Sequence, residues 1–305
     1  RVRSHASVQS QLSLKPLYKR PPFAWQDAAY VAEFGEASVS DVASALSVFG
    51  CARVVAHVAR RSFDEQQAAL DKLSAEELEV LRGSLGMLDA SVALAHKYEL
   101  ARKNPSRLIA FVRKWRKQLE AMEVGEAVMV PGAFMRRSFS PLVLLLERVA
   151  DATFEVAVVN TGDGAAAWHV SSVVSAPPKV QTRTTMRFRG VPRERVLDDG
   201  WWFMFWRLGF SASPANTADK LYDDLLPMLL GRPLEAAMVE DGSVTDDVLC
   251  PLRTNQRAAV TGYRCVREAW VHYLLRHGLS PSSTLYVWLT YMQQWLKLLL
   301  HDLHL

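Results

Sequence analysis

Hydrophobic and polar positions divide this 305-residue chain into three consecutive regions. Up to about Met122 the apolar residues recur every three or four positions, which is the spacing of amphipathic helices. From Gly125 to Val191 the period shortens towards two, as in β-strands, and beyond Val191 it becomes helical again. This order predicts an α+β fold in which an N-terminal helical segment packs on an antiparallel β meander of about five strands, followed by C-terminal helices.

Two helix starts are marked in the front region. Ser74 and Glu77 form the pattern of a capping box, so a helix is expected from Ala75. Asn104 followed by Pro105 predicts a second start, with Asn as the cap and Pro at the first helical position. The apolar stripe of this second helix consists of Leu108, Phe111, Val112, Trp115, Leu119 and Met122. The two helices are expected to form an antiparallel hairpin.

Strands are expected at residues 128–130, 142–149, 154–159, 168–174 and 180–191, with a turn at residues 160–164. The aromatic run at residues 201–206 is apolar on all sides, which predicts a helix buried between layers. Further helices are expected up to Gly231 and up to Gly278, since glycine tolerates the left-handed conformation that ends many helices. A last helix begins at Ser280-Pro281, and its apolar residues are Leu285, Trp288, Leu289, Met292, Leu296 and Leu299.

The domain organisation follows from these regions. We expect a basic extended arm at residues 1–22, a helical segment at 23–123 and an α+β domain at 124–305. The first residue is Arg, and the first twenty residues are basic, free of acids and contain Ser and Gln. Such a start is typical of what remains of an organellar transit segment, or of a fragment of a longer protein.

The composition excludes several classes of protein. Half of the residues are hydrophobic and 22% are charged, a balance typical of globular proteins rather than disordered, collagenous or coiled-coil chains. The longest apolar runs are too short to span a membrane, so no membrane association is expected. Cys51, Cys250 and Cys265 are far apart and odd in number, which favours a reducing compartment, cytoplasmic or organellar.

No pattern in the sequence predicts a cofactor or a metal. Glycine-rich phosphate-binding motifs are absent, and His301 and His304, the one closely spaced pair of histidines, lie at the C-terminal end. The acidic pairs at residues 223–224 and 246–247 lack the order of a calcium loop, and a solvated face is the simpler interpretation.

Charge is distributed unevenly although the net charge is only +4. Residues 1–20 hold five bases and no acid, and residues 97–118 hold eight bases against one acid. The basic residues Arg107, Arg113, Lys114, Arg116 and Lys117 surround Trp115 on the second helix, where they could contact RNA phosphates. This pattern supports one hypothesis, an RNA-associated subunit of an organellar ribonucleoprotein; the alternative is an ordinary solvated helix face.

A segment at the start of the Cys265 helix could carry catalysis. Gln256 precedes Cys265, and a thiol near a helix N-terminus can be activated as a thiolate. The Gln256 amide could then donate to an oxyanion, and His169 is the candidate base. The simpler readings are that Cys265 is a buried core residue and that His169, beside Trp168, is a surface or cap residue.

At these residues the chain resembles papain-like thiol hydrolases, a group that includes many deubiquitinating enzymes. Residues 125–305 are similar in particular to a domain of large uncharacterised protist proteins, through four short motifs in the same order. These are Pro131-Gly132, Asn160-Thr161-Gly162 with His169, Leu221-Tyr222-Asp223-Asp224-Leu225-Leu226-Pro227, and Gln256. The resemblance implies a catalytic set of Cys265, His169 and Gln256.

The chain departs from the papain-like pattern at the nucleophile. Counting from Gln256, the expected position falls at Gly262, with Thr261 as the near alternative, and Cys265 comes almost one helical turn later. A threonine hydroxyl cannot replace a thiolate without a strong base, because its pKa lies far above neutral. We therefore expect a degenerate, non-catalytic protein-interaction module that binds another protein, with an active cysteine hydrolase as the alternative.

Overall fold

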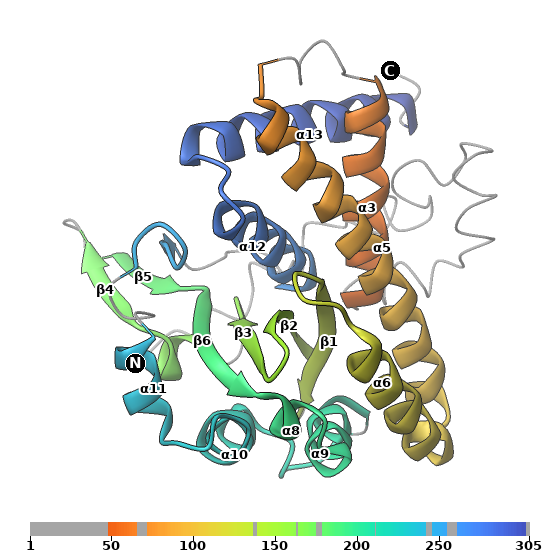
Figure 1. Cartoon of the computed structure of the whole chain (residues 1–305), viewed down its shortest axis with the longest axis vertical. Coiled ribbons are helices and arrows are strands. Elements are labelled where there is room, and N and C mark those ends of the chain that lie inside the picture. Colours follow the sequence, from red (N-terminus) through yellow and green to blue (C-terminus); the bar gives the residue numbers. More distant parts are fainter. Residues whose placement is uncertain are drawn as a thin grey trace, which may run out of the picture.

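The computed structural model describes residues 48–65, 72–136, 139–162, 164–174, 179–210, 212–241, 246–254 and 261–302. The expected arm at residues 1–22 and the candidate residue Gln256 lie outside these ranges. The predicted α+β class is confirmed: helices precede, flank and follow antiparallel strands (Figure 1).

A four-stranded antiparallel sheet forms the centre of the fold. Its strands are β1 (Ala127–Met135), β2 (Phe139–Ala150), β3 (Thr153–Val159) and β6 (Thr185–Pro192), and they neighbour one another in that order. Alternate residues of a strand point to opposite faces, and here both sets are apolar. Leu142, Leu144 and Leu146 of β2 pack into one core, while Val143 and Leu145 pack into the other. The sheet is therefore covered by helices on both faces.

The first core lies between the sheet and the aromatic helix α9 (Asp199–Phe210). As predicted, Trp201, Trp202, Phe205 and Trp206 of this helix are buried. Indole N–H groups rarely remain unpaired when buried, and the Trp206 Nε1 donates to the Pro131 carbonyl of β1 at 2.9 Å. Helix α6 (Leu108–Ala121) packs beside α9, and the whole predicted stripe from Leu108 to Met122 is buried.

The elements after α9 complete this side. They are a π-helix (Lys220–Leu225), α10 (Leu226–Leu230) and α11 (Leu234–Glu240), together with the short α8 (Arg193–Val196) before α9. Gly231 follows α10 with φ of 72°, the left-handed conformation expected at that position.

The second core lies on the opposite face, under α3 (Val48–Glu65), α5 (Ala75–Lys103), α12 (Thr261–Arg276) and α13 (Pro281–Asp302). The capping box at the start of α5 is confirmed, since Ser74 Oγ accepts from the Glu77 N–H at 3.1 Å and Glu77 Oε2 accepts from the Ser74 N–H at 3.0 Å. Trp270 of α12 donates to Ser84 Oγ of α5 at 3.0 Å, which joins these helices inside the core.

The hairpin of α5 and α6 is present (Figure 1), but its turn differs from the expectation. Residues Pro105–Arg107 form a 3₁₀ turn, and α6 begins only at Leu108. Asn104 ends α5, and its side-chain oxygen accepts from the Ser106 hydroxyl instead of capping backbone N–H groups.

The expected meander of about five strands is divided between two sheets. The predicted strand at residues 180–191 splits at Thr184 into β5 (Lys179–Arg183) and β6. A second antiparallel sheet consists of β4 (Ser171–Val174), β5 and β7 (Leu252–Thr254), in the order β4-β5-β7. The predicted strand at 168–174 begins only at Ser171, because residues Ala165–Trp168 form the short helix α7.

Candidate functional site

Cys265 lies in the second core, as the simpler reading of the sequence predicts. It is the fifth residue of α12 and is fully buried. Its Sγ lies 3.4 Å from Thr161 Oγ1 and donates to the Pro141 carbonyl at 3.7 Å. Burial disfavours the charged thiolate and raises the pKa of Cys265 to about 11. The thiol is therefore protonated at neutral pH and inside the protein.

His169 follows α7 as its C-terminal cap residue, but it is not at the surface. The imidazole is buried, and both ring nitrogens have partners. Nδ1 lies 2.8 Å from the Arg183 carbonyl, and Nε2 lies 2.8 Å from the Tyr222 hydroxyl. Burial lowers the pKa of His169 to about 4, so the ring is neutral at pH 7.

The partners of His169 fix the direction of a buried chain of hydrogen bonds. A carbonyl can only accept, so Nδ1 carries the proton and Nε2 is the acceptor. The Tyr222 hydroxyl then donates to Nε2, and it accepts from Asn160 Nδ2 at 3.0 Å. Asn160 Oδ1 in turn accepts from the Gly162 N–H at 2.9 Å. We call Asn160, Tyr222 and His169 the buried triad; it joins the 160–164 turn, the π-helix and the second sheet.

The structure places the residues of the predicted catalytic set in different surroundings. The Cys265 sulfur contacts Thr161 and Pro141, whereas the His169 nitrogens bond Tyr222 and Arg183. Thr261 begins α12, and its carbonyl accepts from Thr161 Oγ1 at 3.3 Å. Gln256 lies within residues 255–260, outside the described part of the chain. The sequence did not indicate Tyr222 as the partner of His169 or Asn160 as the partner of Tyr222, although both residues lie in the short motifs described above.

Arginines neutralise much of the acidic cluster at residues 246–247. Arg183 lies 2.7 Å from the Asp247 carboxylate, and Arg187 lies 3.5 Å from that of Asp246. Arg187 also lies 3.0 Å from Glu155, a buried acid of β3. Among the described residues no three His, Cys, Asp or Glu side chains gather in a way that could hold a metal ion.

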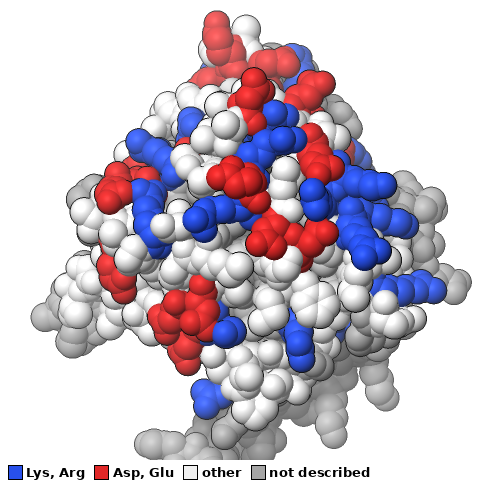
Figure 2. All heavy atoms as spheres, turned by 60° about the horizontal axis from the view of Figure 1, so that its bottom comes forward, with Lys and Arg blue, Asp and Glu red and all other residues white. Residues whose placement is uncertain are grey.

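The predicted basic residues of α6 are exposed but share their surface with acids. Arg107, which lies in the 3₁₀ turn before α6, and Arg113, Lys114, Arg116 and Lys117 of α6 all face solvent. Arg116 pairs with Glu120 at 3.0 Å and lies 3.8 Å from Asp199 of α9. Figure 2 shows Lys and Arg interspersed with Asp and Glu on the face that carries the lower elements of Figure 1. The visible surface is of mixed charge rather than uniformly basic.

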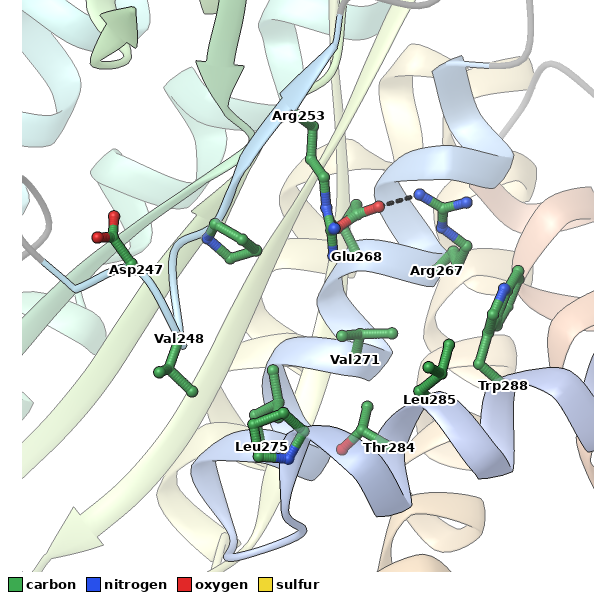
Figure 3. A pocket seen from close by; sticks show the side chains of 12 residues that line it. Asp247, Val248, Arg253, Arg267, Glu268, Val271, Leu275, Thr284, Leu285 and Trp288 are labelled. Atoms are coloured by element: carbon green, nitrogen blue, oxygen red, sulfur yellow. Dashed lines mark hydrogen bonds and ion pairs between the residues drawn. The ribbon is translucent and has the colours of Figure 1, made fainter.

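A pocket of about 420 Å³ opens between α12, α13 and the segment at residues 247–253 (Figure 3). We call it the α12–α13 groove. Its apolar wall is formed by Val248, Pro251, Val271, Leu275, Pro281, Leu285 and Trp288. At one end Arg253 and Arg267 approach the buried carboxylate of Glu268, each on a different oxygen, and the Arg253 Nε lies 3.3 Å from it. The Arg267 guanidinium also lies over the Trp288 ring, 5.1 Å from its centroid.

The side of α13 that continues from this groove is open. Leu285 and Leu289 are each 57% exposed and Met292 is 38% exposed, although these residues define the apolar pattern of the helix. The buried positions of α13 include Thr284, Val287, Tyr291 and Gln294. Leu285, Leu289 and Met292 therefore do not face the second core, whereas Trp288 of the same predicted stripe packs partly against it.

Sequence reasoning did not single out this groove. The groove is formed by two helices and the segment that ends in β7, and the hydrophobic pattern predicts each helix without predicting how they pack together. β7 has only three residues, too few for a recognisable strand pattern. The available signal was Arg253, Arg264 and Arg267 near a single acid, Glu268, at the start of a helix.

Within the described ranges, every helix is too short or too polar to cross a membrane. No protein-family model matches this chain, and neither does any curated protein sequence.

Proposed function

We propose that this chain is a non-catalytic protein-interaction module, a degenerate relative of the papain-like thiol hydrolases that works within a larger protein or assembly. The observation that carries the proposal is that each of the two candidate catalytic groups is bound by residues outside the catalytic set. The His169 ring is held by Tyr222 and the Arg183 carbonyl, and the Cys265 thiol contacts Thr161 and the Pro141 carbonyl.

The protonation states support the same conclusion. A cysteine hydrolase needs a thiolate, which neighbouring cations, an imidazolium or a helix N-terminus can stabilise near neutral pH. Here burial raises the pKa of Cys265 to about 11 and lowers that of His169 to about 4. Both shifts favour the neutral pair, so the start of α12 does not produce an activated nucleophile.

A reducing compartment fits the same proposal. Cys250 and Cys265 are both buried free thiols, and burial raises the pKa of Cys250 to about 12. Protonated, buried thiols react slowly, and both are packed as small hydrophobic side chains. We therefore place the module inside the cell, in the cytoplasm or an organelle.

A ubiquitin probe with a thiol-reactive C-terminal group tests the proposal on the full chain. We expect no adduct at neutral pH, while the same thiols react with iodoacetamide once the protein is unfolded. Cys265→Ala is the matched control for the site of any adduct. An adduct on Cys265 that disappears in His169→Ala would show that the pair is catalytic and would overturn the proposal.

A further inference from the structure

We infer that the α12–α13 groove binds an amphipathic helix of another protein, which places an acidic side chain against Arg253 and Arg267 and aliphatic side chains along α13. The inference rests on the proposed function and names the chemistry of the partner. Three features support it: the apolar wall of the groove, the two arginines that share one carboxylate, and the exposed apolar ridge of α13 that continues from the groove.

The apolar wall has the size and composition of a recognition pocket. Its volume of about 420 Å³ lies within the range of 300–1,000 Å³ that ligand pockets occupy. Figure 3 shows Val271 and Leu275 of α12 across from Leu285 and Trp288 of α13. Aliphatic side chains of a partner would displace water from these surfaces, which is the main driving force of association.

The charge at one end of the groove calls for an acid. Glu268 supplies one carboxylate to two guanidiniums, and both of its oxygens are already engaged. Arg253 and Arg267 remain partly exposed, and guanidiniums have five N–H donors each. A partner carboxylate would reduce this local excess of positive charge through charge-assisted hydrogen bonds.

The second acid of the groove does not compete for the two arginines. Asp247 also lines the groove, and its carboxylate is engaged by Arg183 at 2.7 Å. Arg253 and Arg267 therefore share only the Glu268 carboxylate within the groove.

The shape of the open surface favours a helix over an extended segment. Leu285, Leu289 and Met292 lie at positions i, i+4 and i+7 of α13, so they form one continuous ridge that starts in the groove. Helices recognised in grooves present the same spacing on their own apolar face. A second helix lying along α13 would cover this ridge and could reach the arginines with a residue beside its apolar stripe, because Arg267 lies over Trp288, between Leu285 and Leu289 along the helix.

A second copy of this chain is a less suitable occupant. Along α13 the first acid is Asp302, at the far end of the helix from the groove. An α13–α13 contact would therefore cover the apolar ridge without bringing a carboxylate to Arg253 and Arg267.

A peptide selection tests the inference. A phage-displayed library of alanine-based helices, each with an aliphatic i, i+4, i+7 stripe and one variable residue beside it, is selected on the full chain. We expect Glu or Asp to be enriched at the variable position. The selected peptides are then titrated by fluorescence anisotropy against the full chain and three variants.

The variants separate the groove from the rest of the surface. Leu289→Asp changes an exposed residue of the ridge, and Arg267→Gln removes one cation. Ile109→Asp is the matched control, because Ile109 is an equally exposed apolar residue of α6, at 56%. We expect at least tenfold weaker binding to the first two variants and a change of less than twofold for the control. Arg267→Gln removes one of the two arginines that pair with the buried Glu268, so thermal melting is used to check that this variant is folded. Leu289→Asp leaves the Glu268 ion pairs intact and therefore tests the groove independently of them.

Several results would overturn the inference. They are the selection of no peptide, equal enrichment of neutral or basic residues at the variable position, and undiminished binding to Leu289→Asp. A dimer in light scattering that Leu289→Asp dissociates would identify a second copy as the occupant instead. These failures would leave the result of the ubiquitin probe unchanged, whereas a Cys265 adduct would remove the proposed function whatever the peptides do.

Discussion

The hydroxyl of Tyr222 lies 2.8 Å from Nε2 of His169 and 3.0 Å from Nδ2 of Asn160, so one phenol satisfies two buried polar groups. Trp168 stacks on the same tyrosine ring at 5.1 Å between centroids. This arrangement engages the imidazole of His169, the residue that the sequence suggested as the catalytic base. In this structure His169 contributes to the stability of the turn and the second sheet, and its acceptor nitrogen is not available for a thiol.

Tyr222→Phe should destabilise the protein while keeping the shape of the ring. The substitution leaves the Asn160 amide and the His169 Nε2 without this partner inside the core, at a cost of about 1–3 kcal/mol for each such group. Urea unfolding followed by tryptophan fluorescence measures the loss. Ser282→Ala is the control, because it removes an exposed hydroxyl whose partner, Ser280 Oγ, keeps its bonds to Ser283, and we expect a change below about 0.5 kcal/mol. Equal stability of Tyr222→Phe and the wild type would contradict the assigned hydrogen bonds.

Stability should fall as the pH falls from about 6.5 to 4. An unfolded His169 binds its proton near pH 6.5, whereas in the folded protein its pKa is about 4. Between these values the unfolded state holds more protons, so acid favours unfolding, and the contribution of His169 reaches about 3 kcal/mol. It is fully present above pH 6.5 and does not fall further below pH 4.

Chemical unfolding at several pH values, with His169→Gln as the comparison, isolates this contribution. His272 is also buried with a lowered pKa and gives a slope of the same sign, which His272→Gln removes separately. The same pH slope in wild type and His169→Gln would show that His169 is not buried in its neutral form.

Two glycine-to-alanine substitutions should have opposite effects. A Cβ at Gly132 of β1 would overlap Phe205 Cζ, so the ring of the aromatic helix would have to move. Overpacking of this kind costs about 1–3 kcal/mol. Gly86 of α5 has no atom within 4 Å of the same position, and Ala at a helical site is favoured by about 0.5–1 kcal/mol. Melting temperatures should therefore fall for Gly132→Ala and rise for Gly86→Ala; a fall in both would contradict the packing of α5.

RNA binding through α6 should be weak or absent at moderate salt. The bases of that helix are exposed, but Arg116 is paired with Glu120 and lies 3.8 Å from Asp199, and the face shown in Figure 2 carries both basic and acidic residues. A filter-binding titration with single-stranded RNA at low and moderate salt measures this. Tight binding that weakens steeply with salt and is lost on Arg113→Glu and Lys117→Glu would establish the RNA hypothesis instead.

The local elements of this fold could largely be predicted from the sequence. Ser74 and Glu77 identify the start of α5, and the spacing from Leu108 to Met122 identifies both α6 and its buried face. These signals succeed because each depends on residues within one or two turns of each other. The aromatic run at 201–206 was informative for the same reason, since a helix that is apolar all round must be buried.

Long-range partners could not be predicted in this way. Alternating residues at 180–191 show an extended chain, but they do not show that it changes sheets at Thr184. His169 was expected at the surface or at a cap. A cap position can be predicted from neighbouring residues, but burial of the ring depends on Tyr222, which lies 53 residues away in the sequence. The apolar pattern of α13 indicated a helix correctly, yet Leu285 and Leu289 face outward while Val287 and Tyr291 of the same helix face the second core.

The pH dependence of Cys265 alkylation tests the central claim most directly. The folded chain is treated briefly with iodoacetamide from pH 6 to 10, and the Cys265 peptide is quantified by mass spectrometry. A buried thiol with a pKa of about 11 predicts almost no modification below pH 9 and the same low reactivity in His169→Gln. Rapid alkylation at pH 7 that depends on His169 would show an activated thiolate, and the chain would then be an enzyme.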